Sequence, residues 1–102
     1  MKIITVCGSL KYQNEMMEIT EKMARQGNCM LTPVYSTGKY GCSDEEKKLL
    51  GKEHFEKIKL SDSVLIVNVD NYIGESTTKE IEYAKSLDKE IIYYTDLIKK
   101  NI

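Results

Sequence analysis

The chain has 102 residues, a length that supports one small hydrophobic core but not separate catalytic and specificity domains. We therefore treat residues 1–102 as a single domain. The 15 basic and 16 acidic residues are mixed along the chain and give a formal net charge of −1. This balance excludes the basic surface typical of proteins that bind nucleic acid or anionic membranes, so we expect a small-molecule ligand.

The apolar run at residues 3–7 ends at Gly8, far short of a signal-peptide core or the roughly 20 residues of a membrane span. We expect a cytoplasmic protein. The three cysteines, Cys7, Cys29 and Cys42, form no CxxC pair. This pattern argues against a disulfide framework or a zinc ribbon. We expect free thiols, with Cys7 in the core, and neither a metal nor a cofactor.

The first part of the chain has the pattern of a strand, a helix and a second strand. The strand is predicted at residues 2–6 and the helix at residues 13–25. One face of this helix carries three apolar side chains: Met16, Ile19 and Met23. A second strand is predicted at residues 29–33. The following segment, residues 34–42, contains glycines, tyrosines and hydroxyl residues and is a candidate lid loop.

Residues 43–46, Ser-Asp-Glu-Glu, match a capping box and predict the start of a helix that continues to about residue 60. The single histidine, His54, is spaced by four residues from both Leu50 and Ile58. Residues at this spacing share one face of a helix. We therefore expect His54 to point inward or toward the rim of a cleft.

A third strand is predicted at residues 63–69, where the run is too uniformly apolar for a strand with one face in water. Residues 77–80 are predicted to start the last full helix. Its expected buried stripe consists of Ile81, Ala84 and Leu87. A fourth strand is predicted at residues 90–94, and residues 96–102 form either a short helix or a disordered tail.

Strands joined by single helices pair in parallel with right-handed crossovers. The pattern therefore predicts a three-layer α/β fold, flavodoxin- or Rossmann-like, with a parallel sheet of about four strands in the order 2-1-3-4. In this topology the loops after the first and third strands meet where the strand order reverses, and ligands bind at that point.

These two loops supply the candidate substrate contacts, which are Gly8, Ser9, Leu10, Lys11, Tyr72, Gly74, Glu75 and Ser76. Gly8 permits close approach of the backbone, Ser9 offers a hydroxyl group, and Lys11 offers a mobile positive charge for a phosphate or carboxylate. An ordinary tight turn at Gly8 explains the first loop equally well.

Glu80 is the candidate nucleophile. In the first turn of the predicted helix, free amides and the helix dipole would keep its carboxylate ionised. The spacing of Thr77 and Glu80 also fits a capping box, which requires no function. Glu75 competes for the role from the loop, whereas Glu82 points elsewhere on the helix.

His54 and Asp62 are further candidates. The ordinary pKa of histidine, about 6.5, suits a proton donor or a substrate contact near neutral pH, although a packed histidine is the simpler interpretation. Asp62 opens the third strand, where its hydrogen bonds would hold a loop or cap.

Several segments together resemble the nucleoside 2-deoxyribosyltransferase superfamily, which includes the 2′-deoxynucleoside 5′-phosphate N-hydrolases. Residues 6–11, VCGSLK, resemble the hydrolases' Cys-Gly-Ser-Ile-Arg loop. Residues 80–84, EIEYA, resemble the Glu-Leu-Gly-Tyr-Ala segment that carries the family's nucleophile. Asp62, eighteen residues before Glu80, matches the Asp that begins the preceding strand. Residues 72–77 are similar to small bacterial and phage members of this superfamily.

The resemblance implies a single domain of this fold, Glu80 as nucleophile, Asp62 among the substrate-binding residues, and a homodimer or larger homo-oligomer. His54 stands where the family has a catalytic Asp, Thr5 where it has a Tyr that orients the nucleophile, and Gly74 where the transferases have an Asp that contacts the base. The implied activity is cleavage of the N-glycosidic bond of a nucleoside or its 5′-phosphate, with hydrolysis favoured over transfer. The alternative is a non-catalytic nucleotide-binding or nucleotide-sensing module.

Overall fold

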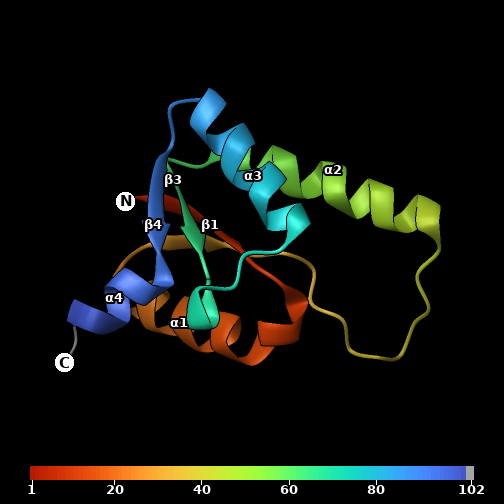
Figure 1. Ribbon diagram of the computed structural model, residues 1–102, viewed down its shortest axis with the longest axis horizontal. Coiled ribbons are helices and arrows are strands. Elements are labelled where there is room, and N and C mark those ends of the chain that lie inside the picture. The colour runs from red at the N-terminus through yellow and green to blue at the C-terminus, as the bar shows by residue number, and fades with distance from the viewer. Residues whose placement is uncertain (101–102) are drawn as a thin grey trace.

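Four parallel strands form one sheet in the order β2-β1-β3-β4, which confirms the predicted topology (Figure 1). Their bounds are β1 Ile3–Cys7, β2 Cys29–Leu31, β3 Ser63–Ile66 and β4 Glu90–Tyr93. The structure is a computed structural model that describes residues 1–100, with only the backbone of Lys100. The last part of the predicted tail, residues 101–102, lies outside the described residues.

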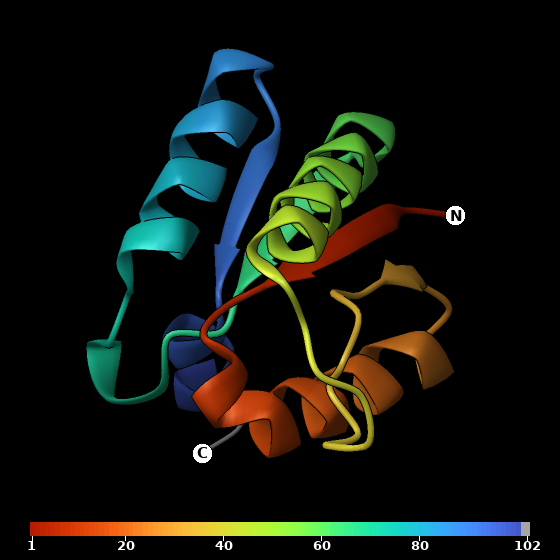
Figure 2. The same ribbon diagram turned by 90° about the vertical axis from the view of Figure 1, so that its right-hand side faces the viewer.

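Helices cover both faces of the sheet, so the predicted three layers are present. The α-helices are α1 Gln13–Arg25, α2 Asp44–Leu60, α3 Glu75–Ser86 and α4 Tyr94–Lys100, and the short 3-10 helices are η1 Leu10–Tyr12 and η2 Val69–Asn71. Figure 2 shows α2 and α3 on one face and α1 and α4 on the other. None of these helices, within residues 1–100, has the length and apolar character needed to cross a membrane.

The alternation of side chains along β1 divides the core into two parts. Ile4 and Val6 pack on the α1 side, whereas Cys7 packs on the side of α2 and α3. On β3, Leu65 belongs to the first part and Ile66 to the second. Because successive residues of a strand point to opposite faces, a strand covered on both sides must be apolar throughout, as predicted for β3.

The capping box at the start of α2 is confirmed. The amide of Glu46 donates to Oγ of Ser43 at 3.1 Å, and the amide of Ser43 donates to Oε1 of Glu46 at 2.9 Å. The first part of α2 projects past the sheet (Figure 1), and residues 44–53 are exposed. Only the second part packs on the sheet, where His54 and Ile58 are buried.

The predicted start of α3 is wrong. The helix begins at Glu75, two residues before Thr77, after an N-cap at Gly74 that makes no side-chain capping bond. Thr77 is buried, at 3% exposure, so its side chain packs in the protein instead of capping a helix end. The helix ends at Ser86, and Leu87, predicted to be buried, is 38% exposed.

The strands predicted at residues 29–33 and 63–69 are longer than the strands in the structure. β2 ends at Leu31 and β3 at Ile66. Beyond β3 the backbone turns into η2, where Asp70 and Asn71 have φ values of 54° and 62°. Asp and Asn are among the few residues that adopt this left-handed conformation readily. The turn directs the chain away from the sheet and toward α3.

Candidate active site

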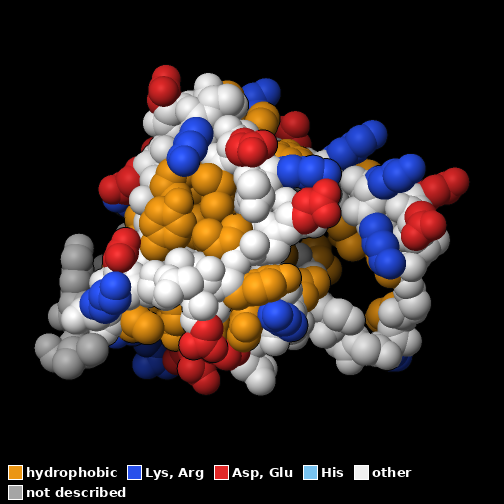
Figure 3. Space-filling model, in the orientation of Figure 1, with side chains coloured by type: hydrophobic (Ala, Val, Ile, Leu, Met, Phe, Trp, Pro, Cys, Tyr) orange, Lys and Arg blue, Asp and Glu red, His pale blue; other side chains and the backbone are white. Residues whose placement is uncertain are grey.

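A cavity of about 980 Å³ lies at the carboxyl end of the sheet. The loops after β1 and β3 both line it, together with α2, the start of α3 and residues 33–37 and 40–42 of the segment that joins β2 to α2. Figure 3 shows an opening here, between the projecting part of α2 and that joining segment. The cavity thus lies at the reversal of strand order, where the topology predicts a ligand site.

Three side chains with reactive groups meet in this region: Cys7 from the end of β1, His54 from α2 and Glu80 from α3. Nε2 of His54 lies 3.4 Å from Sγ of Cys7 and 3.9 Å from Oε2 of Glu80. The side chains of His54 and Glu80 are 8% and 18% exposed, and both line the cavity. Cys7 is fully buried behind them.

Burial changes the protonation of Glu80. It raises the pKa of this carboxyl group from 4.5 to about 7, an effect that a hydrogen bond from the Cys7 thiol partly offsets. The prediction that Glu80 lies in the first turn of its helix is wrong, and the helix terminus does not hold its pKa low. Because α3 starts at Glu75, Glu80 lies in the second turn, and the helix dipole acts mainly within the first turn.

The other two groups are neutral near pH 7. Burial, together with the charge of Lys57, lowers the pKa of His54 to about 4. Burial and the neighbouring Glu80 raise the pKa of the Cys7 thiol well above its usual value. His54 and Glu80 are close enough for an ion pair, but His54 carries no charge at neutral pH, so the contact is not one.

Cys7 is the site residue that the sequence prediction assigned only to the core. Thr5, at the position matched to the family's Tyr, donates instead to the carbonyl of Lys57 and hydrogen-bonds with Ser61. The signal in the sequence that could assign Cys7 to the site is the alternation of side chains along a strand. Cys7 points to the same face as Thr5 and lies one step nearer the ligand end of the sheet.

The first loop is held close to the sheet at Gly8. A Cβ atom there would lie 3.1 Å from the carbonyl oxygen of Val67 and 3.4 Å from Sδ of Met16. Gly8 is thus suited to this close backbone approach. Ser9 and Leu10 follow in the cavity wall, and Oγ of Ser9 accepts from the Lys11 amide at 3.4 Å.

Lys11 lies outside the cavity wall. Its Nζ is 3.7 Å from the ring centroid of Tyr72 and 5.1 Å from that of Tyr12. A cation–π contact of this kind at an exposed position contributes about 0.5–1 kcal/mol. The ammonium group of Lys11 thus lies over the Tyr72 ring, and its contact with a ligand stays a prediction.

The second loop brings the remaining predicted residues to the cavity wall, namely Tyr72, Gly74, Glu75 and Ser76. Glu75, the competing carboxylate, is at the rim, because its side chain is 89% exposed and lies 3.9 Å from Nζ of Lys79. Glu82 is exposed on another face of α3. Glu80 is thus the most buried of these three carboxylates.

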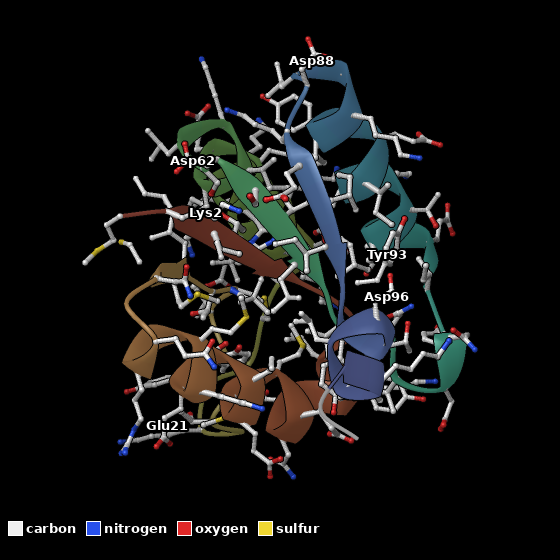
Figure 4. The ribbon with its side chains drawn as sticks, turned by 90° about the vertical axis from the view of Figure 1, so that its left-hand side faces the viewer. Lys2, Glu21, Asp62, Asp88, Tyr93 and Asp96 are labelled. Carbon is white, nitrogen blue, oxygen red and sulfur yellow. The ribbon has the colours of Figure 1, made fainter. Side chains whose placement is uncertain are left out.

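Asp62 is not brought to the cavity. It precedes β3, at the amino end of the sheet, and its Oδ2 accepts from the amide of Ile3 at 2.8 Å. Figure 4 shows Asp62 beside Lys2 at this end of the sheet. The residue joins the first strand to the third, so the substrate contact implied by the family resemblance is wrong for Asp62.

Fold and site define the class: a doubly wound α/β protein with a ligand-sized cavity at its topological switch point and a buried Cys-His-Glu cluster beside it.

No family model and no curated protein matches the sequence. Among solved structures, the chain is similar to a 2-desoxiribosyltransferase from Leishmania mexicana, with a TM-score of 0.69 and 15% sequence identity. The match covers 92% of this chain and 64% of that chain. At this identity the likeness shows the fold.

Proposed function

We propose that this chain cleaves the N-glycosidic bond of a nucleoside, a deoxynucleoside or its 5′-phosphate. The observation that carries the proposal is the position of Glu80, a buried carboxyl group beside His54 in the wall of the cavity. The fold shared with a deoxyribosyltransferase supports the same conclusion. A cavity of about 980 Å³ lies at the upper end of the usual range for small-molecule sites.

In the proposed reaction, the ionised carboxylate of Glu80 attacks C1′ of the sugar. A bond forms between C1′ and a carboxylate oxygen, and the bond between C1′ and the base nitrogen breaks, so its electron pair leaves with the base. Water then attacks C1′, releases Glu80 as the carboxylate and gives up one proton, which the departed base takes up on the nitrogen that was bound to C1′. In a transferase a second base would take the place of water.

His54 positions the departing base. With a pKa of about 4 its imidazole is neutral at pH 7, so it acts as a hydrogen-bonding group instead of a permanently charged acid. The thiol of Cys7 holds both Glu80 and His54 from behind. Ser9, Tyr72 and Ser76 line the cavity and offer hydroxyl groups to the sugar or a phosphate.

Hydrolysis is favoured over transfer. The loop Gly8-Ser9-Leu10-Lys11 resembles the loop of the N-hydrolases, and Gly74 stands where the transferases have an Asp that contacts the base. Glycine has no side chain with which to make that contact. The distinction is measured by adding a second base to the reaction.

The test is base release from deoxynucleosides and their 5′-phosphates, with and without an acceptor base, in buffer that contains a chelator. Wild-type protein should release the base, and Glu80→Gln should lower the rate by at least about 10³-fold. Glu82→Gln, on an exposed face of the same helix, is the matched control and should retain the rate. Absence of base release from every substrate would overturn the proposal.

A non-catalytic nucleotide-binding module is the second candidate. The observation that favours it is the pKa of Glu80, because at about 7 a large fraction of the carboxyl group is protonated at neutral pH and cannot attack carbon. Isothermal titration calorimetry distinguishes the non-catalytic module from the proposed enzyme. Binding of an intact nucleotide that is unchanged in Glu80→Gln, without any base release, would support the module.

We also propose that the chain acts in the cytoplasm as a homodimer or larger homo-oligomer. The exposed apolar side chains around the projecting part of α2, Leu49, Leu50 and Tyr40, support association of this kind. Light scattering coupled to size-exclusion chromatography measures the mass. A monomer at every concentration would contradict the assembly and leave the proposed reaction unaffected.

A further inference from the structure

We propose that Cys7, His54 and Glu80 together bind zinc or a similar divalent transition metal, with a fourth coordination position open to the cavity. The three residues supply one sulfur, one nitrogen and one oxygen ligand atom, all within 4.8 Å of one another. They come from three elements that are distant in the sequence, so no CxxC spacing marks the site. The binding itself does not depend on the proposed glycosidic cleavage.

The distance between the sulfur and nitrogen ligand atoms matches that of a tetrahedral zinc site. Bonds of about 2.3 Å to sulfur and about 2.0–2.1 Å to nitrogen and oxygen place neighbouring ligand atoms roughly 3.3–3.6 Å apart. Sγ of Cys7 and Nε2 of His54 are already 3.4 Å apart. Nε2 of His54 and Oε2 of Glu80 are 3.9 Å apart, and the ligand atoms of Cys7 and Glu80 lie within 4.8 Å of each other, so binding requires the carboxylate to move toward the other two ligands.

The ligand types select the metal. Thiolate and imidazole ligands suit zinc, cobalt and related ions, whereas magnesium and calcium prefer sites made only of oxygen atoms. Binding releases the protons of the Cys7 thiol and the Glu80 carboxyl group to solvent. The resulting thiolate and carboxylate balance the two positive charges of the ion, which lowers the cost of burying it.

The surrounding structure both holds the ligands and admits the ion. Cys7 is fixed by the pairing of β1 with β3, while His54 and Glu80 lie on α2 and α3, which pack on the same face of the sheet. His54 and Glu80 line the cavity, which provides the entry path and the fourth position. Three protein ligands with one open position are typical of zinc sites that bind water or substrate.

The hydrogen bonding of the second ring nitrogen of His54 indicates how tightly the metal ion should bind. Its Nδ1 is buried and has no hydrogen-bond partner among residues 1–100. Metal-bound histidines usually donate this second N–H to an acceptor, and loss of such a partner lowers metal affinity by about 10–100-fold. We therefore expect weaker binding than at a structural zinc site, with an exchangeable ion that chelators remove.

Cobalt(II) is the probe. Titration of the chelator-treated, reduced protein should give one equivalent of bound cobalt, with the near-ultraviolet absorption of a cobalt–thiolate bond and the strong visible absorption of four-coordinate cobalt. Cys7→Ser should remove the thiolate absorption, and His54→Gln should weaken binding by at least 10-fold. Cys29→Ser, which removes an exposed thiol outside the cavity wall, is the matched control and should bind like the wild type.

Several results would overturn the metal site. One is no thiolate absorption in the wild type, and another is thiolate absorption that remains in Cys7→Ser. Circular dichroism reports whether each variant folds, and His54→Gln, which retains the thiol, decides the matter if Cys7→Ser does not fold. Zinc should also raise the Tm of the wild type but not of His54→Gln.

If the proposed cleavage also holds, bound zinc coordinates the carboxylate that attacks the sugar. Base release should then fall as zinc is added and return when a chelator removes the zinc. This part rests on the proposed function. Cobalt binding without any base release would support the metal site alone. Base release in chelator without any metal binding would support the cleavage alone.

Discussion

Oε2 of Glu80 lies 3.9 Å from Nε2 of His54, and burial moves the pKa values of the two groups in opposite directions. The pKa of Glu80 rises to about 7 and that of His54 falls to about 4. Between these values both side chains are neutral, and the proton that is lost near pH 7 is the one on Glu80. Above pH 7 the carboxylate is ionised beside a neutral imidazole.

Base release should increase with pH through about pH 7. With a pKa of about 7, Glu80 is about 1% ionised at pH 5 and about 90% ionised at pH 8, so kcat/KM should rise by about 100-fold between them. The measurement is kcat/KM across this range in chelator-containing buffer. A flat profile, or one that falls with pH, would contradict Glu80 as the attacking group.

Glu80→Gln should stabilise the protein at high pH. The folded-state pKa of Glu80 is raised above 4.5, so the protonated form favours folding below pH 4.5, and this contribution is lost as the pH rises through 7. Glutamine avoids that loss. Urea unfolding should show a gain of about 1–3 kcal/mol at pH 8 and little change at pH 4.5.

The matched control for this stability change is Glu82→Gln, because Glu82 is exposed on the same helix. It should alter the free energy of unfolding by less than about 0.5 kcal/mol at either pH. A similar gain at pH 4.5 and pH 8 in Glu80→Gln would show that the effect comes from packing instead of ionisation.

Asp62→Ala should lower stability without changing the reaction. It removes the acceptor of the Ile3 amide at the end of the sheet away from the cavity, at a cost of about 1–3 kcal/mol. Asp62→Asn, which retains an acceptor oxygen, should restore most of this loss. Urea unfolding measures the loss of stability, and kcat/KM for base release shows whether the reaction is unchanged. A large loss of kcat/KM in folded Asp62→Ala would indicate that Asp62 contacts the substrate.

Gly8→Ala and Gly51→Ala should have opposite effects on stability. At Gly8 the added carbon would lie 3.1 Å from a backbone oxygen, which should cost about 1–3 kcal/mol and displace the loop that lines the cavity. Gly51 lies in exposed α2 with no atom within 4 Å of an added Cβ, and alanine there should stabilise the helix by about 1 kcal/mol. Thermal unfolding followed by circular dichroism measures both, and equal effects would contradict the close contact at Gly8.

The order of elements and the 2-1-3-4 sheet follow from the sequence by itself. Hydrophobic periodicity is a local property, and the rules for parallel connections leave few topologies for four strands joined by helices. The capping box at Ser43 is equally local and was predicted correctly. The spacing of Leu50, His54 and Ile58 was sufficient to place the histidine on the inward face of its helix.

The tertiary structure decided the chemistry of the site. Gly74, not Thr77, precedes α3, and this shift places Glu80 in the second turn, where burial by other elements raises its pKa. Only packing of α2 and α3 on one face of β1 brings His54 and Glu80 to the thiol of Cys7. Periodicity shows which face of an element is buried, but the groups that meet there come from distant parts of the chain, and their pKa values depend on that meeting.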